Sequence, residues 1–423
     1  MHFIHFVLIF CALQRTSNGF FLEIEKSFDL SKFRGPVPKD KDVYRNVSQL
    51  IKSNGYPCEE HFVETEDNFI LNIQRIPHGR NENNSRTESK PIVFLQHGLL
   101  ADSACWVFNF PDDSLAYILA DNGFDVWLGN SRGNRYARRN THLSPECLKF
   151  WKWSFDDLAK YDLPATVDYI RSTTKQDKLV YIGHSQGTLI AFAAFSTNPE
   201  LAKKIKLFVA LAPIATIGNI NVPFLRTLAE VVTVIDAVAP LIDAPFFPGD
   251  IWRTQFVEKG FCNGLTEEKL CYQVAKFVVG DDPTNVNYSR IPVFLNNFPS
   301  GTSLRNMVHF AQLLLSGKCQ MFDYGIIENY FHYGQAKPPQ YNVSKITVPI
   351  AVFSGSHDTL SDPADVKLLL PRLKSLVYNK YLEEFNHVDF VMGLNANVVL
   401  YPYVVELAKK YSSLENGRNI TII

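Results

Sequence analysis

One five-residue stretch limits how this chain can fold more than any other part of the sequence. The stretch GHSQG (183–187) follows directly on the apolar run KLVYI (178–182) and precedes a helical pattern that continues through residues 191–195. A strand that passes into a helix through so short a turn holds its central residue in strained backbone. A Cβ at either flanking position would collide with neighbouring strands. We therefore predict a sharp strand-to-helix turn that presents the hydroxyl of Ser185, an arrangement called a nucleophile elbow.

Short apolar runs alternate with helical patterns from about residue 60 to 215, and the alternation returns near the end of the chain. Such runs are typical of parallel strands that helices cover on both faces. Together with the elbow, this order predicts an α/β class and an α/β-hydrolase fold. In that fold a mostly parallel sheet is flanked by helices and carries an inserted helical cap. The predicted strands are PIVFLQ (91–96), FDVWL (124–128), KLVYIG (178–183), IKLFVAL (205–211) and VPIAVFS (348–354).

Two helices are predicted in the α/β part of the chain, one between two of these strands and one after the last of them. Ser154 opens the stretch 154–171, and a serine hydroxyl there can accept a hydrogen bond from the first turn. Pro164 lies inside the same stretch and predicts a kink or a restart, because proline cannot donate a backbone hydrogen bond. The second helix, 362–370, follows the last predicted strand.

The middle of the chain has a different pattern. From about residue 217 to 343 the alternation stops, and amphipathic or wholly apolar segments such as 225–242 replace it. An insertion of this size within an α/β sheet predicts a cap or lid over a functional site. We expect a cap at 216–343 and a core formed by 20–215 and 344–423. The apolar and aromatic residues at 245–256 and 322–333 are expected to bind a hydrophobic ester.

A serine hydroxyl attacks efficiently only when a histidine removes its proton and an acid orients that histidine. In this fold the order along the chain is Ser, acid, His. Four histidines follow Ser185, and His387 lies beyond the last predicted strand, where that order requires it. His309 sits in an apolar helical pattern typical of a core residue, His332 in an aromatic loop, and His357 directly before the acid candidates. His387 is the predicted base.

Three aspartates compete for the acid position. Asp358 comes just after the strand predicted at 348–354, at the edge of the sheet where sites in α/β proteins gather. Asp362 precedes Pro363, and Asp365 comes three residues after Asp362, a pattern typical of a helix N-terminus. We therefore predict Asp358 as the triad acid and the other two as structural.

The tetrahedral intermediate of acyl transfer needs two backbone N–H donors, which together form an oxyanion hole. The residue after the nucleophile, Gln186, supplies one of them in this fold. The other is expected from the loop QHGLL (96–100), where the turn at His97 and Gly98 makes Leu99 the predicted donor. The competing interpretation of that turn is an ordinary tight turn.

Charge and cysteine spacing exclude several classes of protein. The chain has 42 Lys and Arg against 43 Asp and Glu, a formal net charge of -1, whereas nucleic-acid binding normally needs a basic surplus. No Cys-x-x-Cys pair or Cys/His ligand spacing occurs, so no metal site is predicted. We expect neither a cofactor nor a nucleic-acid partner.

The first residues indicate the compartment. Residues 1–13 (MHFIHFVLIFCAL) are apolar, but they are fewer than the roughly 20 residues that cross a bilayer. A polar tract with small residues at Ser17 and Gly19 follows, which predicts a signal peptide at 1–19. The alternative is a buried N-terminal strand. No other run is suited to be a membrane anchor, so a secretory-route protein, secreted or lysosomal, is expected.

Glycosylation and disulfide candidates fit the same route. Removing Cys11 with the signal peptide leaves six of the seven cysteines, of which Cys262 and Cys271 are the likeliest disulfide. The other four can be buried thiols. The candidate glycosylation sites, each in an Asn-x-Ser/Thr sequon, are Asn46, Asn83, Asn287, Asn342 and Asn419.

Several motifs together resemble the acid lipase family of gastric lipase and lysosomal acid lipase. The motifs are FLQHGLLADS (94–103), DVWLGNSRGN (125–134), GHSQGT (183–188) and FNHVDF (385–390), and the resemblance runs from about residue 46 to 407. It implies the triad and oxyanion residues predicted above, a disulfide between the two cap cysteines, and hydrolysis of triacylglycerols or cholesteryl esters. Segment 215–250 matches poorly, Met392 stands where the family often has Trp, and 277–279 (FVV) where it has another Cys. These departures leave the substrate preference open.

The sequence thus predicts a serine lipase that hydrolyses carboxylic esters of neutral lipids at a lipid–water interface through Ser185, His387 and Asp358. One alternative is a hydrolase of small soluble esters, or an acyltransferase, that uses the same triad. Another is a non-catalytic lipid-binding protein. Oligomeric state stays open.

Overall fold

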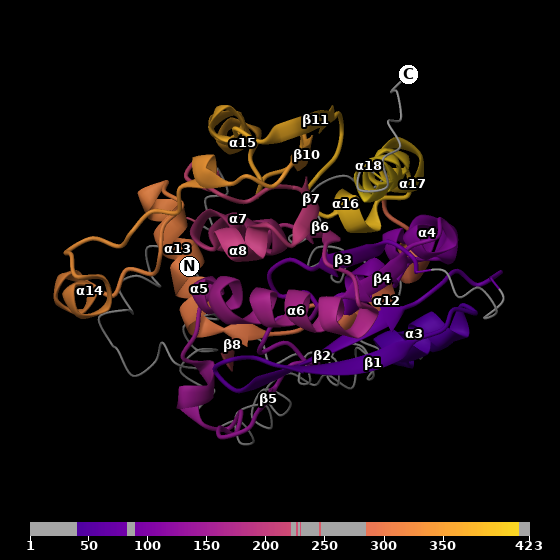
Figure 1. Cartoon of the computed structure of the whole chain (residues 1–423), viewed down its shortest axis with the longest axis horizontal. Coiled ribbons are helices and arrows are strands. Elements are labelled where there is room, and N and C mark those ends of the chain that lie inside the picture. Colours follow the sequence, from indigo (N-terminus) through magenta and orange to yellow (C-terminus); the bar gives the residue numbers. More distant parts are fainter. Residues whose placement is uncertain are drawn as a thin grey trace, which may run out of the picture.

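A computed structural model of the chain describes residues 40–82, 89–220, 226, 229, 245–246 and 285–413 (Figure 1). Its centre is a nine-stranded sheet of order β1-β2-β4-β3-β6-β7-β10-β11, with β5 paired to β2. From β4 through β11 the neighbours run parallel, whereas β1 and β2 form an antiparallel pair at one edge. The predicted α/β class with a mostly parallel sheet is confirmed. The strands of this sheet are β1 (Glu59–Glu64), β2 (Phe69–Ile76), β3 (Ile92–Gln96), β4 (Asp125–Leu128), β5 (Arg139–Asn140), β6 (Leu179–His184), β7 (Ile205–Leu211), β10 (Ile350–Gly355) and β11 (Leu376–Leu382).

Helices cover both faces of the sheet, which explains why its central strands are apolar along their whole length. Alternate residues of a strand point to opposite faces. In β3, Val93 and Leu95 therefore join one hydrophobic cluster, while Ile92 and Phe94 join the other. The first cluster is closed by α3 (Val47–Ser53), α4 (Leu115–Asp121) and α18 (Tyr401–Ser413), and the second by α6 (Leu163–Thr174) and α7 (Gln186–Thr197). The remaining helices are α5 (Phe155–Asp157), α8 (Pro199–Ala202), α12 (Ile291–Asn297), α13 (Leu304–Ser316), α14 (Ile326–Tyr333), α15 (Pro363–Leu369), α16 (Asp389–Met392) and α17 (Ala396–Val399).

The predicted helix at 154–171 forms, with a change of geometry at the predicted place. Ser154 caps α5, since its Oγ accepts a hydrogen bond from the backbone N–H of Asp156. A π-helical segment, Leu158–Asp162, then leads into α6, and Pro164 sits in the first turn of that helix. A proline in a first turn removes no intrahelical hydrogen bond, so the predicted restart is confirmed.

Several elements differ from the sequence-based expectations. Strands β1, β2 and β11 were not among the predicted ranges. The edge strand β11 alternates half-buried and exposed residues instead of forming a continuous apolar run. The segment around His332, expected as a loop, is helix α14. The apolar pattern around His309 is helical as predicted and forms α13.

The described part of the predicted cap lies against the loops at one edge of the sheet. Its two-residue strands β8 (Pro245–Phe246) and β9 (Thr302–Ser303) pair with each other. The backbone N–H of Ser300 donates to Leu100 O at 2.6 Å, and Ser303 Oγ donates to Trp153 O at 2.6 Å. Apart from residues 226, 229 and 245–246, the segments predicted at 225–242 and 245–256 lie outside the described residues. Across the described ranges, no helix combines the length and apolar character needed to cross a membrane.

A buried arginine fixes the loop that follows β4. Arg132 is 1% exposed; its Nε donates to Asp162 Oδ1 at 2.7 Å and an Nη donates to Asp67 Oδ1 at 2.8 Å. Burial disfavours the charged guanidinium, but the carboxylates of Asp162 and Asp67 outweigh it and raise the pKa of Arg132. The backbone N–H of Arg132 also donates to Asp162. The loop, the β1–β2 turn and the start of α6 are thereby tied together.

We predict that Asp162→Asn lowers the free energy of unfolding by about 3–5 kcal/mol, because it leaves part of a buried charge uncompensated. Urea denaturation measures the loss. The matched control is Asp168→Asn on the same helix, since Asp168 pairs with Arg171 and Lys204 but its side chain is 49% exposed. That change should cost no more than about 1 kcal/mol. Equal losses in the two variants would contradict the prediction.

A carboxylate at the start of α5 joins the core to the segment that carries α14. The hydroxyl of Tyr341 donates to Asp156 Oδ1 at 2.7 Å, and the backbone N–H of Phe322 donates to Oδ2 at 2.9 Å. Both hydrogen bonds favour the charged carboxylate, yet burial outweighs them and raises the pKa of Asp156 to about 6. Burial of this carboxyl group therefore favours its protonated, neutral form.

This raised pKa predicts that Asp156 contributes more to the free energy of unfolding in acid than at neutral pH. Because the folded-state pKa lies above the ordinary value of 3.8, the stabilisation is fully present below about pH 4 and is lost as the pH rises through about 6. Asp156→Asn is neutral at every pH and should remove this dependence. The measurement is the difference in unfolding free energy between the wild type and Asp156→Asn at a series of pH values. A difference that stays constant from pH 4 to pH 7 would refute the prediction.

Candidate active site

The turn from β6 into α7 has the tight geometry that the sequence predicts. Ser185 has φ +55° and ψ −121°, a strained conformation for a residue with a side chain. A Cβ on Gly183 would lie 2.7 Å from Gly187 O, and a Cβ on Gly187 would lie 2.4 Å from Gln96 O on β3. Real Cβ atoms do not approach backbone so closely. Both flanking positions therefore require glycine, and the serine between them is held at the end of the strand.

Ser185, His387 and Asp358 form one hydrogen-bonded chain. Ser185 Oγ lies 2.7 Å from His387 Nε2, and His387 Nδ1 lies 3.0 Å from each carboxylate oxygen of Asp358. Because a carboxylate only accepts hydrogen bonds, Nδ1 carries the imidazole proton, and Nε2 presents its lone pair to the serine hydroxyl. The three side chains are nearly buried, at 8%, 7% and 1% exposure respectively. This is the arrangement in which a histidine can take the proton of an attacking serine.

Two neighbouring strands deliver the acid and the histidine. Asp358 follows β10, and its Oδ1 also accepts hydrogen bonds from the N–H groups of Leu360 at 2.9 Å and Ser361 at 2.7 Å, which fix the carboxylate. His387 follows β11. A Cβ on Gly355 would lie 2.2 Å from Phe385 O, so the two loops pack directly on each other. The carboxyl ends of parallel strands thus bring together residues that are far apart in sequence.

A second histidine, which the sequence analysis did not single out, contacts the predicted base. His184 Nε2 donates to the backbone oxygen of His387 at 2.8 Å, and the two ring centroids lie 5.0 Å apart. Burial, and to a smaller extent the nearby charge of His387, lower the pKa of His184 to about 3. His184 therefore stays neutral in mild acid and adds no second positive charge beside His387. Its place in the GHSQG motif marks it as a neighbour of Ser185, but the contact with His387 depends on the fold.

The loop after β3 passes directly over the nucleophile. A Cβ on Gly98 would lie 2.9 Å from Ser185 Cβ and 3.3 Å from Ser185 Oγ, so only glycine lets the loop come this close. Leu99 follows in that loop, and Leu100 takes φ +61° as the chain turns away. Gln186 is the first residue of α7, immediately after Ser185. The two predicted N–H donors thus belong to segments that adjoin the nucleophile, and their donor role stays a prediction.

A buried imidazole holds this loop in place. His97 Nδ1 donates to Gly98 O at 2.8 Å, while its Nε2 accepts from the backbone N–H of Ser131 at 3.0 Å and lies 3.2 Å from Asn134 Nδ2. Burial lowers the pKa of His97 and keeps the ring neutral. Ser131 is adjacent to Arg132, so the buried ion pairs support the oxyanion loop through His97.

The other residues weighed as acid or base take structural positions. Asp362 caps α15 by accepting from the N–H of Ala364 at 2.8 Å, as predicted. Asp365 accepts two hydrogen bonds from Asn219, at 2.9 and 3.0 Å. His309 is fully buried and bonded through both ring nitrogens, and burial lowers its pKa to about 3. Across the described ranges, no three His, Cys, Asp or Glu side chains form a group that could hold a metal ion.

Three of the candidate glycosylation sites are described, and each caps a short helical turn. Asn46 lies before α3, and Asn287 and Asn342 lie before 3₁₀ turns. Each cap uses the side-chain oxygen as acceptor and so does not use the amide nitrogen, the atom to which a glycan is attached. The predictions that fall outside the described residues are the signal peptide 1–19, Cys262, Cys271, Asn83 and Asn419.

The cysteines at 58, 105, 147 and 319 are free thiols. Cys319 is buried, Cys58 and Cys105 are partly buried, and Cys147 is exposed. The expectation of four buried thiols therefore fails at Cys147.

Two family models match the chain. One, described as a partial alpha/beta-hydrolase lipase region, matches residues 47–110, and one described as alpha/beta hydrolase fold matches residues 91–392. Among solved structures, a soluble variant of monoglyceride lipase from Saccharomyces cerevisiae is similar with a TM-score of 0.52 at 15% identity. The similarity covers 89% of this chain and 99% of that one, and at so low an identity it supports the fold alone.

Curated relatives are similar over most of their length. Gastric triacylglycerol lipase from Homo sapiens is 46% identical over 374 residues, which is 88% of this chain and 92% of that protein. Lipase member K from Homo sapiens is 46% identical over 86% of this chain and 91% of its own length. Lysosomal acid lipase/cholesteryl ester hydrolase from Homo sapiens is 44% identical, with 88% and 92% covered. The chain therefore belongs to the acid lipase family of the α/β-hydrolases.

Proposed function

We propose that this chain is a serine lipase of the secretory route that hydrolyses carboxylic esters of neutral lipids. The single observation that supports the chemistry best is the continuous hydrogen-bonded path from Ser185 through His387 to Asp358. All three side chains are nearly buried, so the imidazole has few competing partners. Membership of a lipase family supports the same reaction class.

In the first half of the reaction, Ser185 Oγ attacks the ester carbonyl as its proton passes to His387 Nε2. The imidazolium that forms donates through Nδ1 to Asp358, which stays ionised and stabilises it. The negative charge on the carbonyl oxygen is bound by the backbone N–H groups of Leu99 and Gln186. One such donor contributes about 2.7–4 kcal/mol to the transition state. The helix N-terminus at Gln186 also favours negative charge at this point.

In the second half, the alcohol leaves and a water molecule releases the acyl group. His387 gives its proton from Nε2 to the alcohol oxygen as the bond to the acyl carbon breaks, which leaves an ester on Ser185. Water then attacks that ester with His387 again as base, and the fatty acid departs. His184, which burial keeps neutral, holds the backbone of His387, so the same ring can serve as base in one step and as acid in the next.

The names of the relatives support the proposed substrate class and compartment. The names of two of them specify triacylglycerol and cholesteryl ester, and both are uncharged lipids. We extend that class to this chain, together with a signal peptide at 1–19. The core at 20–215 and 344–423, a cap at 216–343 and a Cys262–Cys271 disulfide belong to the same proposal.

The nucleophile can be tested by covalent labelling. An active-site phosphonate should label the wild type and fail to label Ser185→Ala, and hydrolysis should fall by at least about 10³-fold, because the attacking atom is lost. Labelling is read by intact-mass spectrometry. Ser196→Ala is the matched control, since Ser196 lies on the same helix and its hydroxyl bonds only to Ala193 O. Continued labelling of Ser185→Ala would refute the assignment.

The substrate class can be tested with a panel of esters. We expect kcat/KM on emulsified triolein or cholesteryl oleate to exceed that on soluble p-nitrophenyl butyrate by at least about tenfold, because long acyl chains bury more apolar area. Measurements at pH 4.5 and pH 7.5 cover both expected compartments. A preference for the short soluble ester, or transfer to added alcohols in place of hydrolysis, would favour one of the alternatives on the same triad.

A further inference from the structure

Helix α14 presents four large apolar or aromatic side chains to solvent and buries the polar Asn329 against the protein. Ile326, Ile327 and Phe331 are 70%, 73% and 80% exposed, and Tyr330 is 58% exposed. Asn329, on the opposite side, is 1% exposed. A surface helix of a soluble protein normally has the reverse arrangement, with apolar residues facing the core. The helix lies at the left-hand end of the molecule in Figure 1, away from the central sheet.

The orientation of α14 is fixed by hydrogen bonds of Asn329 and by ring contacts of His332 and Tyr333 with Tyr324, and not by burial of Ile326, Ile327 and Phe331. Asn329 Nδ2 donates to Asp323 Oδ1 at 2.7 Å and to Ala336 O at 2.9 Å, and its Oδ1 accepts from the backbone N–H of Tyr324 at 2.9 Å. These bonds join the helix to the chain on both of its sides. These contacts hold the helix in place, so its position does not depend on the outward-facing apolar side chains.

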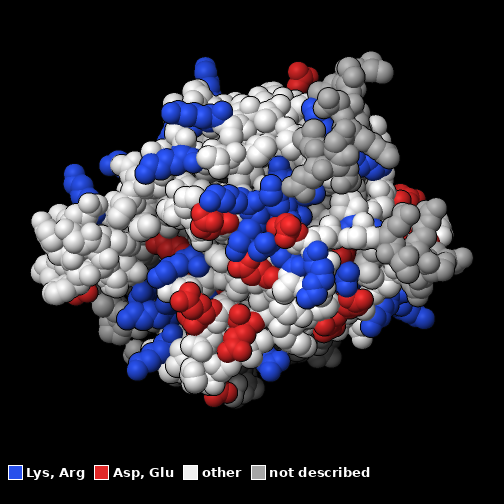
Figure 2. All heavy atoms as spheres, in the orientation of Figure 1, with Lys and Arg blue, Asp and Glu red and all other residues white. Residues whose placement is uncertain are grey.

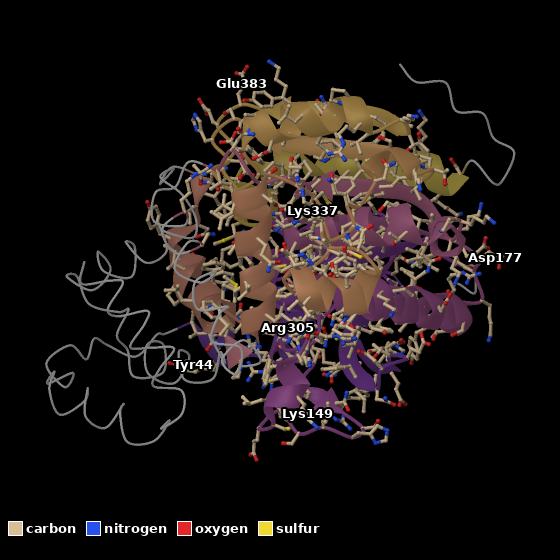
Figure 3. All side chains as sticks on the ribbon, turned by 90° about the vertical axis from the view of Figure 1, so that its left-hand side faces the viewer. Tyr44, Lys149, Asp177, Arg305, Lys337 and Glu383 are labelled. Atoms are coloured by element: carbon tan, nitrogen blue, oxygen red, sulfur yellow. The ribbon has the colours of Figure 1, made fainter. Side chains whose placement is uncertain are left out.

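The charge on this surface matches an uncharged lipid. Residues 325–336 contain no Lys or Arg and one acidic residue, Glu328, and the next charged residue is Lys337. Figure 2 shows this end of the molecule largely free of charged side chains, and Figure 3 labels Lys337 and Arg305 on the same side. Arg305 lies over the rings of Phe322 and Tyr324. A surface that binds anionic phospholipid carries a cluster of basic residues, and α14 has none.

We propose that α14 is a docking surface for the lipid–water interface of uncharged lipids. Ile326, Ile327, Tyr330 and Phe331 would enter the lipid, in the way that aromatic and aliphatic side chains of interfacial helices do. The proposal rests on the proposed function and deepens it, because it assigns the element that holds the enzyme on an emulsified substrate.

The docking surface is connected to the catalytic machinery through short, bonded steps. The segment before α14 binds Asp156 of α5 through Phe322. Helix α13, which precedes that segment, reaches the oxyanion region, since Asn306 Nδ2 donates to Gln186 Oε1 at 2.8 Å. A lipid surface that α14 binds is thereby held at a fixed position relative to Ser185.

The test separates docking from catalysis. Binding is measured by flotation of the full chain carrying Ser185→Ala with a triolein emulsion coated by phosphatidylcholine. Adding Ile327→Gln and Phe331→Gln should weaken binding by roughly tenfold for each side chain replaced, the size expected for an apolar side chain leaving lipid. The matched control replaces Leu368 and Val398 by Gln, since these apolar side chains are 60% and 69% exposed on other helices. That control should bind normally.

In the catalytically active chain, Ile327→Gln with Phe331→Gln should lower hydrolysis of the triolein emulsion and leave kcat/KM on soluble p-nitrophenyl butyrate unchanged. Unchanged flotation would overturn the proposal. So would binding that requires phosphatidylserine, or a loss on the soluble ester equal to that on the emulsion. A change in oligomeric state alone, read by light scattering, would instead identify the surface as a contact between copies. Normal flotation with an inactive wild type would refute the proposed function while the docking proposal stands.

Discussion

The close contact between α7 and β3 is the constraint from which the site is built. Gly187 approaches Gln96 O so closely that a Cβ there would lie 2.4 Å away, and the chain can make this approach only by turning sharply at Ser185. The turn holds the serine at φ +55°, and the stability of the surrounding sheet sustains that strain. The loop that leaves β3 must then cross the serine, where Gly98 gives it room. The nucleophile and both predicted oxyanion donors thus follow from one packing contact.

Parallel pairing of the strands positions the other two residues of the proposed triad. Asp358 and His387 are 29 residues apart, and His387 and Ser185 are 202 residues apart, yet each lies at the carboxyl end of the sheet. Fixed donors hold the acid, and His184 holds the backbone of the base. The geometry therefore depends on the register of β6, β10 and β11, and a shift of one strand would separate the three side chains. The arrangement of the three side chains therefore depends on the stability of the sheet.

Local signals account for what could be predicted from the sequence. The continuous apolar strands, the glycines of the elbow, the Ser154 cap and the Asp362 cap each depend on neighbours a few residues away. The contacts of His184 with the predicted base and of His97 with the oxyanion loop do not, because both partners are chosen by tertiary packing. Strand β11 is an edge strand whose residues are buried on one side only, so the pattern that identifies the central strands is absent from it. The contacts of His184 and His97 and the edge strand β11 were not predicted, because they depend on tertiary packing and not on neighbouring residues in the sequence.

Helix α14 shows the limit of apolar patterning most clearly. The aromatic and aliphatic residues of 322–333 predicted a hydrophobic ester site, and a pattern of spacing does identify which residues share one face of a helix. It does not determine whether that face points inward. Here the direction is set by Asn329, whose three hydrogen bonds would be lost if the helix turned to bury Ile327 and Phe331. Leaving those buried amide groups unpaired would cost about 1–3 kcal/mol each, so the bonds of Asn329 favour the orientation in which this residue faces inward. Contact with a lipid surface in place of water would lower the free energy of these same apolar side chains.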